Sequence, residues 1–437
     1  MSDMQNILDV SIEINGIQRK VGCISGNTPD GASFSYAEDY LNGKDLDGAK
    51  PYPISIHLPL REEPFSPEIT KVFFEGLLPE CFTRRSVAQW MRVDENDYLS
   101  ILEGLGNECL GAIRISKQGA DAPVASYQKL RKNKIRALAA EGAASTALYV
   151  TESRLSLTGA SGKVGLYYDE GKDAWYQPTG NAPSTHIVKQ SHVRLGEIVL
   201  NEQLTLKTAE KLGIDVSPSF IINLGDGNDE DVLLAIKRYD RDMNGVRDVD
   251  GLICPLRRHQ EDMAQALGIS PQLKYESTGE NYLAKVAQII LRHSSNPIVD
   301  IRKLWDITVY NWLIGNTDNH IKNLSLLYSP NLGAASLAPA YDLVSTIIYP
   351  SVSRDMAMSI GGVFKIDDIG MEEWAKSAAE IGMGRGLALD RIDEMREKFE
   401  PALKESAKEL AAGGFSQARK MSNKILKNRA MRTVPMA

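Results

Sequence analysis

The sequence predicts an α+β protein, and three features of its hydrophobic pattern indicate this class. Apolar and polar residues alternate near the N-terminus, which is typical of half-buried strands. Alternation returns after about residue 150, and beyond about residue 250 apolar residues recur at the spacing of amphipathic helices. The chain has 437 residues, 43% of them hydrophobic and 24% charged, an ordinary globular composition with ample core.

The first predicted domain covers residues 1–145 and mixes strands with helices. Apolar residues alternate with polar ones over residues 10–14. The Asn15-Gly16 pair that follows is typical of a type I′ hairpin turn, because both turn positions need a positive φ. Residues 66–106 then change to helical spacing, so we expect helices packed against an N-terminal sheet.

The second predicted domain covers residues 146–247 and is rich in strands. Alternation at 155–157 and again at 164–168 predicts strands on either side of a turn-rich break at 159–163, and a helix is predicted to begin near Glu197. This helix should end at Gly213, because glycine readily takes the left-handed conformation that follows a helix. Two further strands are predicted at 219–224 and 232–239.

The third predicted domain, residues 248–437, is an all-α lobe interrupted by one polar loop. A helix at 302–314 ends at Gly315, and the polar run 317–323 follows it. Alternation then resumes and predicts two short strands, the second ending at Asp342. The other predicted helices are at 261–267, 280–293, 372–382, 388–411 and 415–430.

Charge and composition exclude several classes of protein. The net charge of -7 does not indicate a nucleic-acid binder. No apolar run approaches the roughly 20 residues that span a bilayer, so no membrane partner is expected, and the N-terminus lacks the pattern of a signal peptide. The four cysteines form no CxxC pair, which favours reduced thiols in a cytoplasmic protein over disulfides or a zinc site.

Three polar residues in the third domain fit the requirements of phosphoryl transfer. This chemistry needs an aspartate to orient and deprotonate a hydroxyl, and an asparagine and a second aspartate to hold magnesium against nucleotide phosphates. Asp318 and Asn323 have the D-x-x-x-x-N spacing of protein kinases, and Asp342 follows one hairpin later. A mainly β lobe followed by a helical lobe with this loop is the plan of a two-lobed kinase.

Each of these residues also has a structural interpretation. Asp318 could lie in a surface turn after a helix, and Asp342 could cap a turn at the end of a strand. A single D-x-x-x-x-N pair is expected by chance in a chain of this length. The complete order of helix, polar loop, hairpin and Asp342 favours the catalytic interpretation.

Two features upstream fit the same chemistry. Lys189 is predicted to lie on a strand before the helix that contains Glu202, and kinases use such a lysine to neutralise nucleotide phosphates. The glycine-bearing segment 158–163 could bind phosphate through its backbone N–H groups, although a plain β-turn has the same composition. Ser156 lies just before this segment, and a phosphate there would add about -1.5 to -2 charges and repel nucleotide or eject the loop.

Short motifs recur along nearly the whole chain. They lie at 59–62, 107–112, 155–163 (S-x-x-G-A-x-x-K), 185–189 (T-H-I-x-K), 238–241 (R-[FY]-D-R), 260–262 (Q-E-D), 315–323 and 341–342. In these motifs the chain resembles HipA-type serine/threonine kinases, the toxin half of HipBA toxin–antitoxin modules. The resemblance implies a two-lobed, protein-kinase-like (HipA-like) fold with an N-terminal mixed α/β part, a small β subdomain and a mainly α-helical C-terminal lobe.

The resemblance also implies roles for individual residues. Asp318 would be the catalytic base, Asn323 and Asp342 would bind Mg²⁺, and Ser156 would be an inhibitory autophosphorylation site. Some members carry Gln-Glu where this chain has Ser161-Gly162, and glutamate is common in place of Lys237. The residues implied to contact ATP are Thr158, Gly159, Ala160, Ser161, Gly162, Lys163, Lys189, Lys237, Arg238, Tyr239, His320, Lys322, Asn323, Tyr341 and Asp342.

The partners implied by the resemblance are a HipB-like helix-turn-helix antitoxin, operator DNA reached mainly through the antitoxin complex, and a protein substrate. In some family members that substrate is an aminoacyl-tRNA synthetase. Two other functions are compatible with the spacing alone: a catalytically silent corepressor, and a kinase of small molecules or lipids. The presence of Asp318, Asn323, Asp342 and Lys189 speaks against the first, and only the resemblance speaks against the second.

Overall fold

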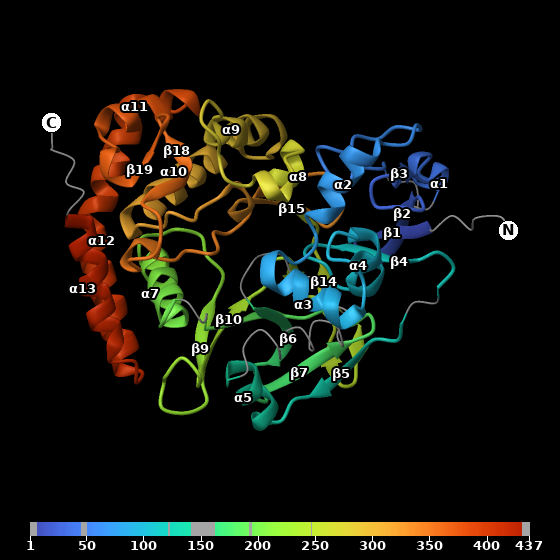
Figure 1. Cartoon of the computed structure of the whole chain (residues 1–437), viewed down its shortest axis with the longest axis horizontal. Helices are drawn as coiled ribbons and strands as arrows, with labels where there is room; N and C mark the ends of the chain where they lie inside the picture. Colours follow the sequence, from blue (N-terminus) through green and yellow to red (C-terminus); the bar gives the residue numbers. More distant parts are fainter. Residues whose placement is uncertain are drawn as a thin grey trace. The chain divides into compact units, whose positions relative to one another are not determined.

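The computed structural model describes residues 7–44, 50–120, 123–140, 162–191, 195–245 and 247–430 (Figure 1). The chain divides into two compact units. Unit 1 comprises Met1–His192, Ala235–Pro271 and Leu327–Ala335. Unit 2 comprises Val193–Leu234, Gln272–Leu326 and Ser336–Ala437.

Unit 1 begins with an antiparallel sheet in the order β3-β2-β1-β4. Asn15 and Gly16 join β1 to β2 with φ values of 51° and 81°, which confirms the predicted hairpin turn. The apolar face of this sheet packs on helices and on an aromatic cluster around Phe34. The elements are β1 (Ile7–Ile14), β2 (Ile17–Ser25), β3 (Ser33–Tyr36), α1 (Glu38–Leu41), α2 (Pro67–Glu75), α3 (Cys81–Met91), α4 (Tyr98–Leu105) and β4 (Ile113–Lys117).

The second sheet of unit 1 has the order β5-β7-β6-β8-β10. The boundary between the units crosses β10, and the first half of this strand neighbours β9 within unit 2. Figure 1 shows β6 and β7 of this sheet in green and α5 in teal. The elements are β5 (Ser126–Lys129), α5 (Lys132–Ala140), β6 (Lys163–Asp169), β7 (Ala174–Thr179), β8 (His186–Gln190), β9 (Ser219–Asn223) and β10 (Val232–Lys237).

Unit 2 is built around the buried helix α10 (Pro297–Ile314). Trp305 and Trp312 of α10 both pack edge-on against Trp374 of α11, with ring centroids 5.2 and 5.6 Å apart. Because α10 is buried along its last three turns, its C-terminal end is firmly placed. The other helices are α7 (Ile198–Lys211), α9 (Tyr282–His293), α11 (Met371–Glu380), α12 (Arg385–Ala412) and α13 (Gln417–Ala430).

Residues 248–430 are mainly helical, but the predicted all-α description does not fit them. They contain short strands as well as helix α8 (Met263–Leu267). The predicted polar hairpin is present, although its second strand ends at Leu337 and not at Asp342. No helix in the described part of the chain is long and apolar enough to cross a membrane. The strands after β10 are β11 (Arg241–Asp242), β12 (Asp248–Val249), β13 (Leu252–Ile253), β14 (Leu256–Arg257), β15 (Gln260–Asp262), β16 (Ser325–Tyr328), β17 (Ala335–Leu337), β18 (Asp355–Ile360) and β19 (Val363–Lys365).

Candidate active site

The buried amide of Asn316 organises the polar loop of unit 2. Helix α10 ends at Gly315, whose φ of 72° reverses the chain. Asn316 follows at once, and its Nδ2 donates to Asn311 Oδ1 (2.7 Å) and to the main-chain oxygen of Asp342 (3.0 Å). Its Oδ1 accepts the main-chain N–H of Asp318 (3.2 Å). One buried side chain therefore links the helix end to two of the predicted site residues.

The loop turns so that Asp318 and Asn323 come together. The main-chain oxygen of Asp318 accepts the N–H of His320 (2.8 Å) and the Nδ2 of Asn323 (3.1 Å). The Asp318 side chain is exposed, whereas Asn323 is buried. Because the amide nitrogen of Asn323 is engaged in this bond, its oxygen is the atom suited to a cation.

Asp342 lies beyond the strand that was predicted to end there, in an irregular segment with a φ of 52°. This left-handed conformation is strained for a residue other than glycine and persists only where neighbours hold it. Ala340 before it donates its N–H to the main-chain oxygen of Asp215 (2.8 Å). Tyr341 donates its hydroxyl to the main-chain oxygen of Lys322 (2.7 Å), which joins this segment to the polar loop.

The segment after Asp342 is held by helix α7. Asn201 of α7 donates its Nδ2 to the main-chain oxygen of Ser345 and accepts the N–H of Ser345 with its Oδ1, both at 3.0 Å. The Thr205 hydroxyl donates to the main-chain oxygen of Leu343. Asp342 is thus held on both sides, by Asp215 and the polar loop before it and by α7 after it.

The donor set of Asn323 and Asp342 fits magnesium. Mg²⁺ prefers hard oxygen ligands and is commonly held by one or two protein oxygens, with water and substrate phosphates supplying the rest. An amide oxygen and a carboxylate match this preference. The part of the chain that the structure describes contains no group of three or more His, Cys, Asp and Glu residues able to hold a metal without such a substrate.

Unit 1 places two of the predicted nucleotide-contacting lysines on one face of a sheet. In the antiparallel register of β6 and β8, Lys163 lies directly opposite Lys189. Opposed residues of such a pair have their side chains on the same face, about 5 Å apart at Cβ. Two lysines on one face of a sheet favour an anionic ligand. Ser156 and the predicted loop residues Thr158, Gly159, Ala160 and Ser161 lie outside the described residues.

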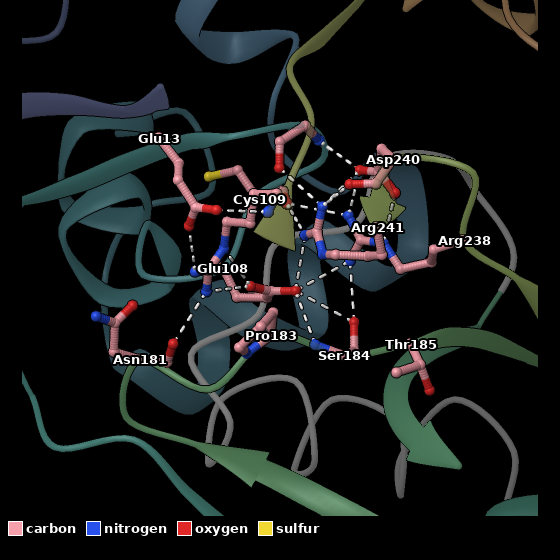
Figure 2. A network of polar contacts seen from close by, with 12 residues as sticks. Glu13, Glu108, Cys109, Asn181, Pro183, Ser184, Thr185, Arg238, Asp240 and Arg241 are labelled. Carbon is pink, nitrogen blue, oxygen red and sulfur yellow. Dashed lines mark hydrogen bonds and ion pairs between the residues drawn. The ribbon is translucent and has the colours of Figure 1, made fainter. Parts of the chain in front are cut away.

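The predicted hinge, residues 237–239, follows β10 directly. The N–H of Arg238 donates to the main-chain oxygen of Thr185 (2.9 Å), which continues the sheet pairing. Lys237 is partly exposed and its Nζ lies 3.4 Å from Glu170. The Arg238 side chain points the other way, into a buried cluster of charges, so its guanidinium is committed to the protein interior (Figure 2).

This buried charge cluster joins the hinge to distant parts of unit 1 (Figure 2). Glu108 accepts hydrogen bonds from Arg238 (3.1 Å), Arg241 (2.9 Å) and the unlabelled Arg257 (2.8 Å). Burial alone would raise the pKa of Glu108, but the three guanidinium groups hold it well below its usual range. Arg238 donates to both carboxylate oxygens of Asp240. Burial acts to raise the pKa of Asp240, but Arg238 and Arg241 outweigh it and leave the pKa lowered.

Sequence reasoning missed Asn316, Asn201, Tyr275 and the role of Glu108. Asn316 and Tyr275 both contact Asp318, and Asn201 contacts the segment that follows Asp342. The polar pair Asn316-Thr317 after a buried helix was a usable signal for Asn316. Glu108 stood in a motif, but nothing local in the sequence pointed to arginines 130 and more residues away.

Comparison with known proteins agrees with this geometry. The family of HipA-like C-terminal domains matches residues 155–403, and the family of HipA N-terminal domains matches residues 12–116. A putative kinase of Sinorhizobium fredii, Y4mE, is 33% identical over 384 residues, which cover 86% of this chain and 87% of that protein. The serine/threonine-protein kinase toxin HipA of Shewanella oneidensis is 26% identical over 391 residues, covering 86% and 85%.

A solved structure shares the fold. The chain is similar to one in the complex of Shewanella oneidensis HipA, HipB and its operator DNA, with a TM-score of 0.74 and 22% identity over 98% of this chain and 100% of that one. Fold and relatives together define the class, an α+β kinase. The chain belongs to the HipA family.

Proposed function

We propose that this chain is an ATP- and Mg²⁺-dependent serine/threonine protein kinase. The observation that supports it best is the convergence of Asp318, Asn323 and Asp342 through the Asn316 amide and the Tyr341 hydroxyl. Asp318 is the base, because its carboxylate is exposed while its backbone is fixed on both sides. Asn323 and Asp342 hold Mg²⁺, which supplies charge neutralisation at the nucleotide phosphates.

In the proposed reaction the oxygen of an acceptor hydroxyl forms a bond to the γ-phosphorus of ATP. The bond from that phosphorus to the bridging oxygen breaks, and ADP leaves with the electron pair. Asp318 orients the acceptor and takes its proton. Positioning and charge stabilisation carry most of the catalysis in this class of reaction, which is why the fixed backbone around the loop matters.

Nucleotide-contacting residues are proposed in unit 1 and, separately, in unit 2. In unit 1 the adjacent lysines Lys163 and Lys189 bind phosphate, and the backbone of 237–239 faces adenine. In unit 2, His320 and Lys322 of the polar loop contact the nucleotide, together with Tyr341. In this scheme residues 1–145, 146–247 and 248–437 are the N-terminal, nucleotide-binding and catalytic domains, and phosphorylation of Ser156 switches the enzyme off by ejecting the segment 158–163.

We further propose that the chain is the toxin of a HipBA-type module. The curated relative from Shewanella oneidensis bears the name of a kinase toxin, and the solved complex holds HipA with HipB and operator DNA. The partner is then a HipB-like antitoxin, and the pair represses its own operon. The acceptor is a serine on a translation-related protein, with an aminoacyl-tRNA synthetase as the first candidate.

The test compares Asp318→Asn with Asp390→Asn, which changes an exposed carboxylate on α12. Transfer of labelled γ-phosphate from ATP to casein and to the chain itself should fall about 10²- to 10⁴-fold in Asp318→Asn, because the base is lost. Asp390→Asn should match the parent protein. Equal transfer by Asp318→Asn and the parent would contradict the proposed function. Phosphopeptide analysis of the same samples should find phosphate on Ser156 only where transfer occurs.

A further inference from the structure

Tyr275 of unit 2 lies in the loop between α8 and α9, beside the polar loop that carries Asp318. Backbone hydrogen bonds hold the residues on both sides of it. The main-chain oxygen of Lys274 accepts the N–H of Ile321 (3.4 Å), and the N–H of Glu276 donates to the main-chain oxygen of Ala357 (2.9 Å). The loop therefore has little freedom at this point.

The anchoring of Glu276 is stronger than one backbone bond. Its buried carboxylate accepts hydrogen bonds from the N–H of Tyr282 (3.1 Å) and from the N–H of Ser359 (3.2 Å). Glu276 faces inward, and Tyr275 faces outward with 48% of its surface exposed. Because the residues on both sides are fixed, the exposed ring of Tyr275 is held in one position.

The phenol of Tyr275 reaches the proposed base. Its hydroxyl donates to Oδ1 of Asp318 at 2.8 Å. The ring meets the imidazole of His320 edge to face, with centroids 5.5 Å apart, so the ring position is supported independently of the hydroxyl. An acceptor hydroxyl must come within about 2.6–3.2 Å of the base that takes its proton, and the phenol lies within this range.

We propose that the Tyr275 hydroxyl occupies the place of the acceptor hydroxyl on Asp318 and keeps water from that place until a protein acceptor displaces it. This inference rests on the proposed function. Displacement exchanges one hydrogen bond to the carboxylate for another, so a serine hydroxyl can replace the phenol at little cost. A water molecule brings no binding contacts of its own to offset the loss of the phenol.

The consequence is a measurable side reaction. With Mg·ATP and no acceptor, the oxygen of water would attack the γ-phosphorus, the bond to the bridging oxygen would break, and the water proton would pass to Asp318. The products are ADP and inorganic phosphate. Tyr275→Phe keeps the ring against His320 but removes the hydroxyl, so it opens Oδ1 to water. A tyrosine that merely orients Asp318 would give the opposite result, because its loss would slow every transfer.

The experiment measures phosphate release from Mg·ATP by the whole chain. Tyr168→Phe is the matched control, because the Tyr168 hydroxyl also donates to a carboxylate, that of the exposed Asp173 in unit 1, with a distance of 2.7 Å to Oδ1. We expect Tyr275→Phe to hydrolyse ATP about tenfold faster than the parent, the scale of one hydrogen bond to a charged group. Tyr168→Phe should match the parent, and nucleotide affinity from a thermal-shift titration should be the same in all three proteins.

Measuring Asp318→Asn in the same experiment separates failure of the role given to Tyr275 from failure of the proposed kinase function. If the parent releases phosphate faster than Asp318→Asn but Tyr275→Phe equals or falls below the parent, the role given to Tyr275 is wrong and the kinase proposal stands. If the parent and Asp318→Asn are equal in both hydrolysis and transfer to casein, the proposed function itself fails. If Tyr275→Phe releases phosphate faster than the parent and the double variant with Asp318→Asn does not, both the role of Tyr275 and the kinase proposal are supported.

Discussion

Glu108 and Glu261 are both buried in unit 1, yet their pKa values move in opposite directions. Burial acts on each carboxyl and disfavours its charged form. Around Glu108 three arginines reverse the effect, and the pKa is lowered. Among the described residues Glu261 accepts from neutral donors, the hydroxyls of Ser55 and Tyr328 and the N–H of Ile56, so burial prevails and raises its pKa to about 7.

The raised pKa of Glu261 predicts a pH-dependent stability. The folded chain holds the proton of Glu261 between about pH 4.5 and 7, whereas the unfolded chain releases it. Stability contributed by this group is therefore present at low pH and is lost as the pH rises through 7, on the order of 3 kcal/mol in all. Thermal melts of the parent and Glu261→Gln should show a melting-temperature difference that falls from pH 5 and levels off above about pH 7.

Glu397→Gln, an exposed change on α12, serves as the control for that series and should follow the parent at every pH. A melting-temperature difference between the parent and Glu261→Gln that stays constant across the range would show that Glu261 is charged in the folded protein.

At the scale of elements, helix α7 is joined to the segment after Asp342 by the Asn201 amide and the Thr205 hydroxyl. Asn201→Ala leaves the buried N–H and C=O of Ser345 without this partner, which should cost about 2–4 kcal/mol of unfolding free energy. It should also weaken Mg·ATP binding, because the segment after Asp342 loses part of its support from α7. Urea unfolding and a thermal-shift titration with Mg·ATP measure the two effects.

Gln203→Ala is the matched change on the same helix, since the Gln203 amide donates to Ser219 on β9. It should lower stability and leave Mg·ATP affinity unchanged. Equal losses of affinity in both variants would mean that Asn201 acts through general stability and not through Asp342.

Elements with a strong local signal were predictable from the sequence. The Asn15-Gly16 hairpin, the helix ending at Gly213 and the helices of unit 2 lie close to their predicted positions. The start of α10 was placed five residues late, because Pro297 at its first turn lies outside the periodic apolar run. The second hairpin strand was predicted to reach Asp342, five residues too far. The strand ends at Leu337, and no local signal in the sequence marks that end.

At the scale of the whole molecule, the chain's long-range polar contacts had no local signal. Glu108 meets three arginines that are 130 or more residues away, and Asn201 meets Ser345 across 144 residues. Such contacts depend on how elements pack and not on their spacing. The polar loop of Asp318 and Asn323 could be found because all of its residues lie within one short segment.

The buried charge cluster predicts a large, cooperative effect of one substitution. Glu108→Gln removes the shared carboxylate from three buried arginines and should lower the free energy of unfolding by about 3–5 kcal/mol. Glu103→Gln on α4 removes only a partly exposed pair with Lys117 and should change it by less than about 1 kcal/mol. Urea titrations of both variants check this, and similar midpoints would show that the cluster contributes nothing net.

The register between β6 and β8 decides whether Lys163 and Lys189, proposed to bind phosphate, lie on the same face of the sheet. Side chains along β6 alternate between the two faces of the sheet, so a slip of one residue against β8 would send the two ammonium groups to opposite sides. A single-residue insertion between Lys163 and Val164 would leave the composition almost unchanged and still divide the pair. An insertion of two residues at the same point would restore the shared face.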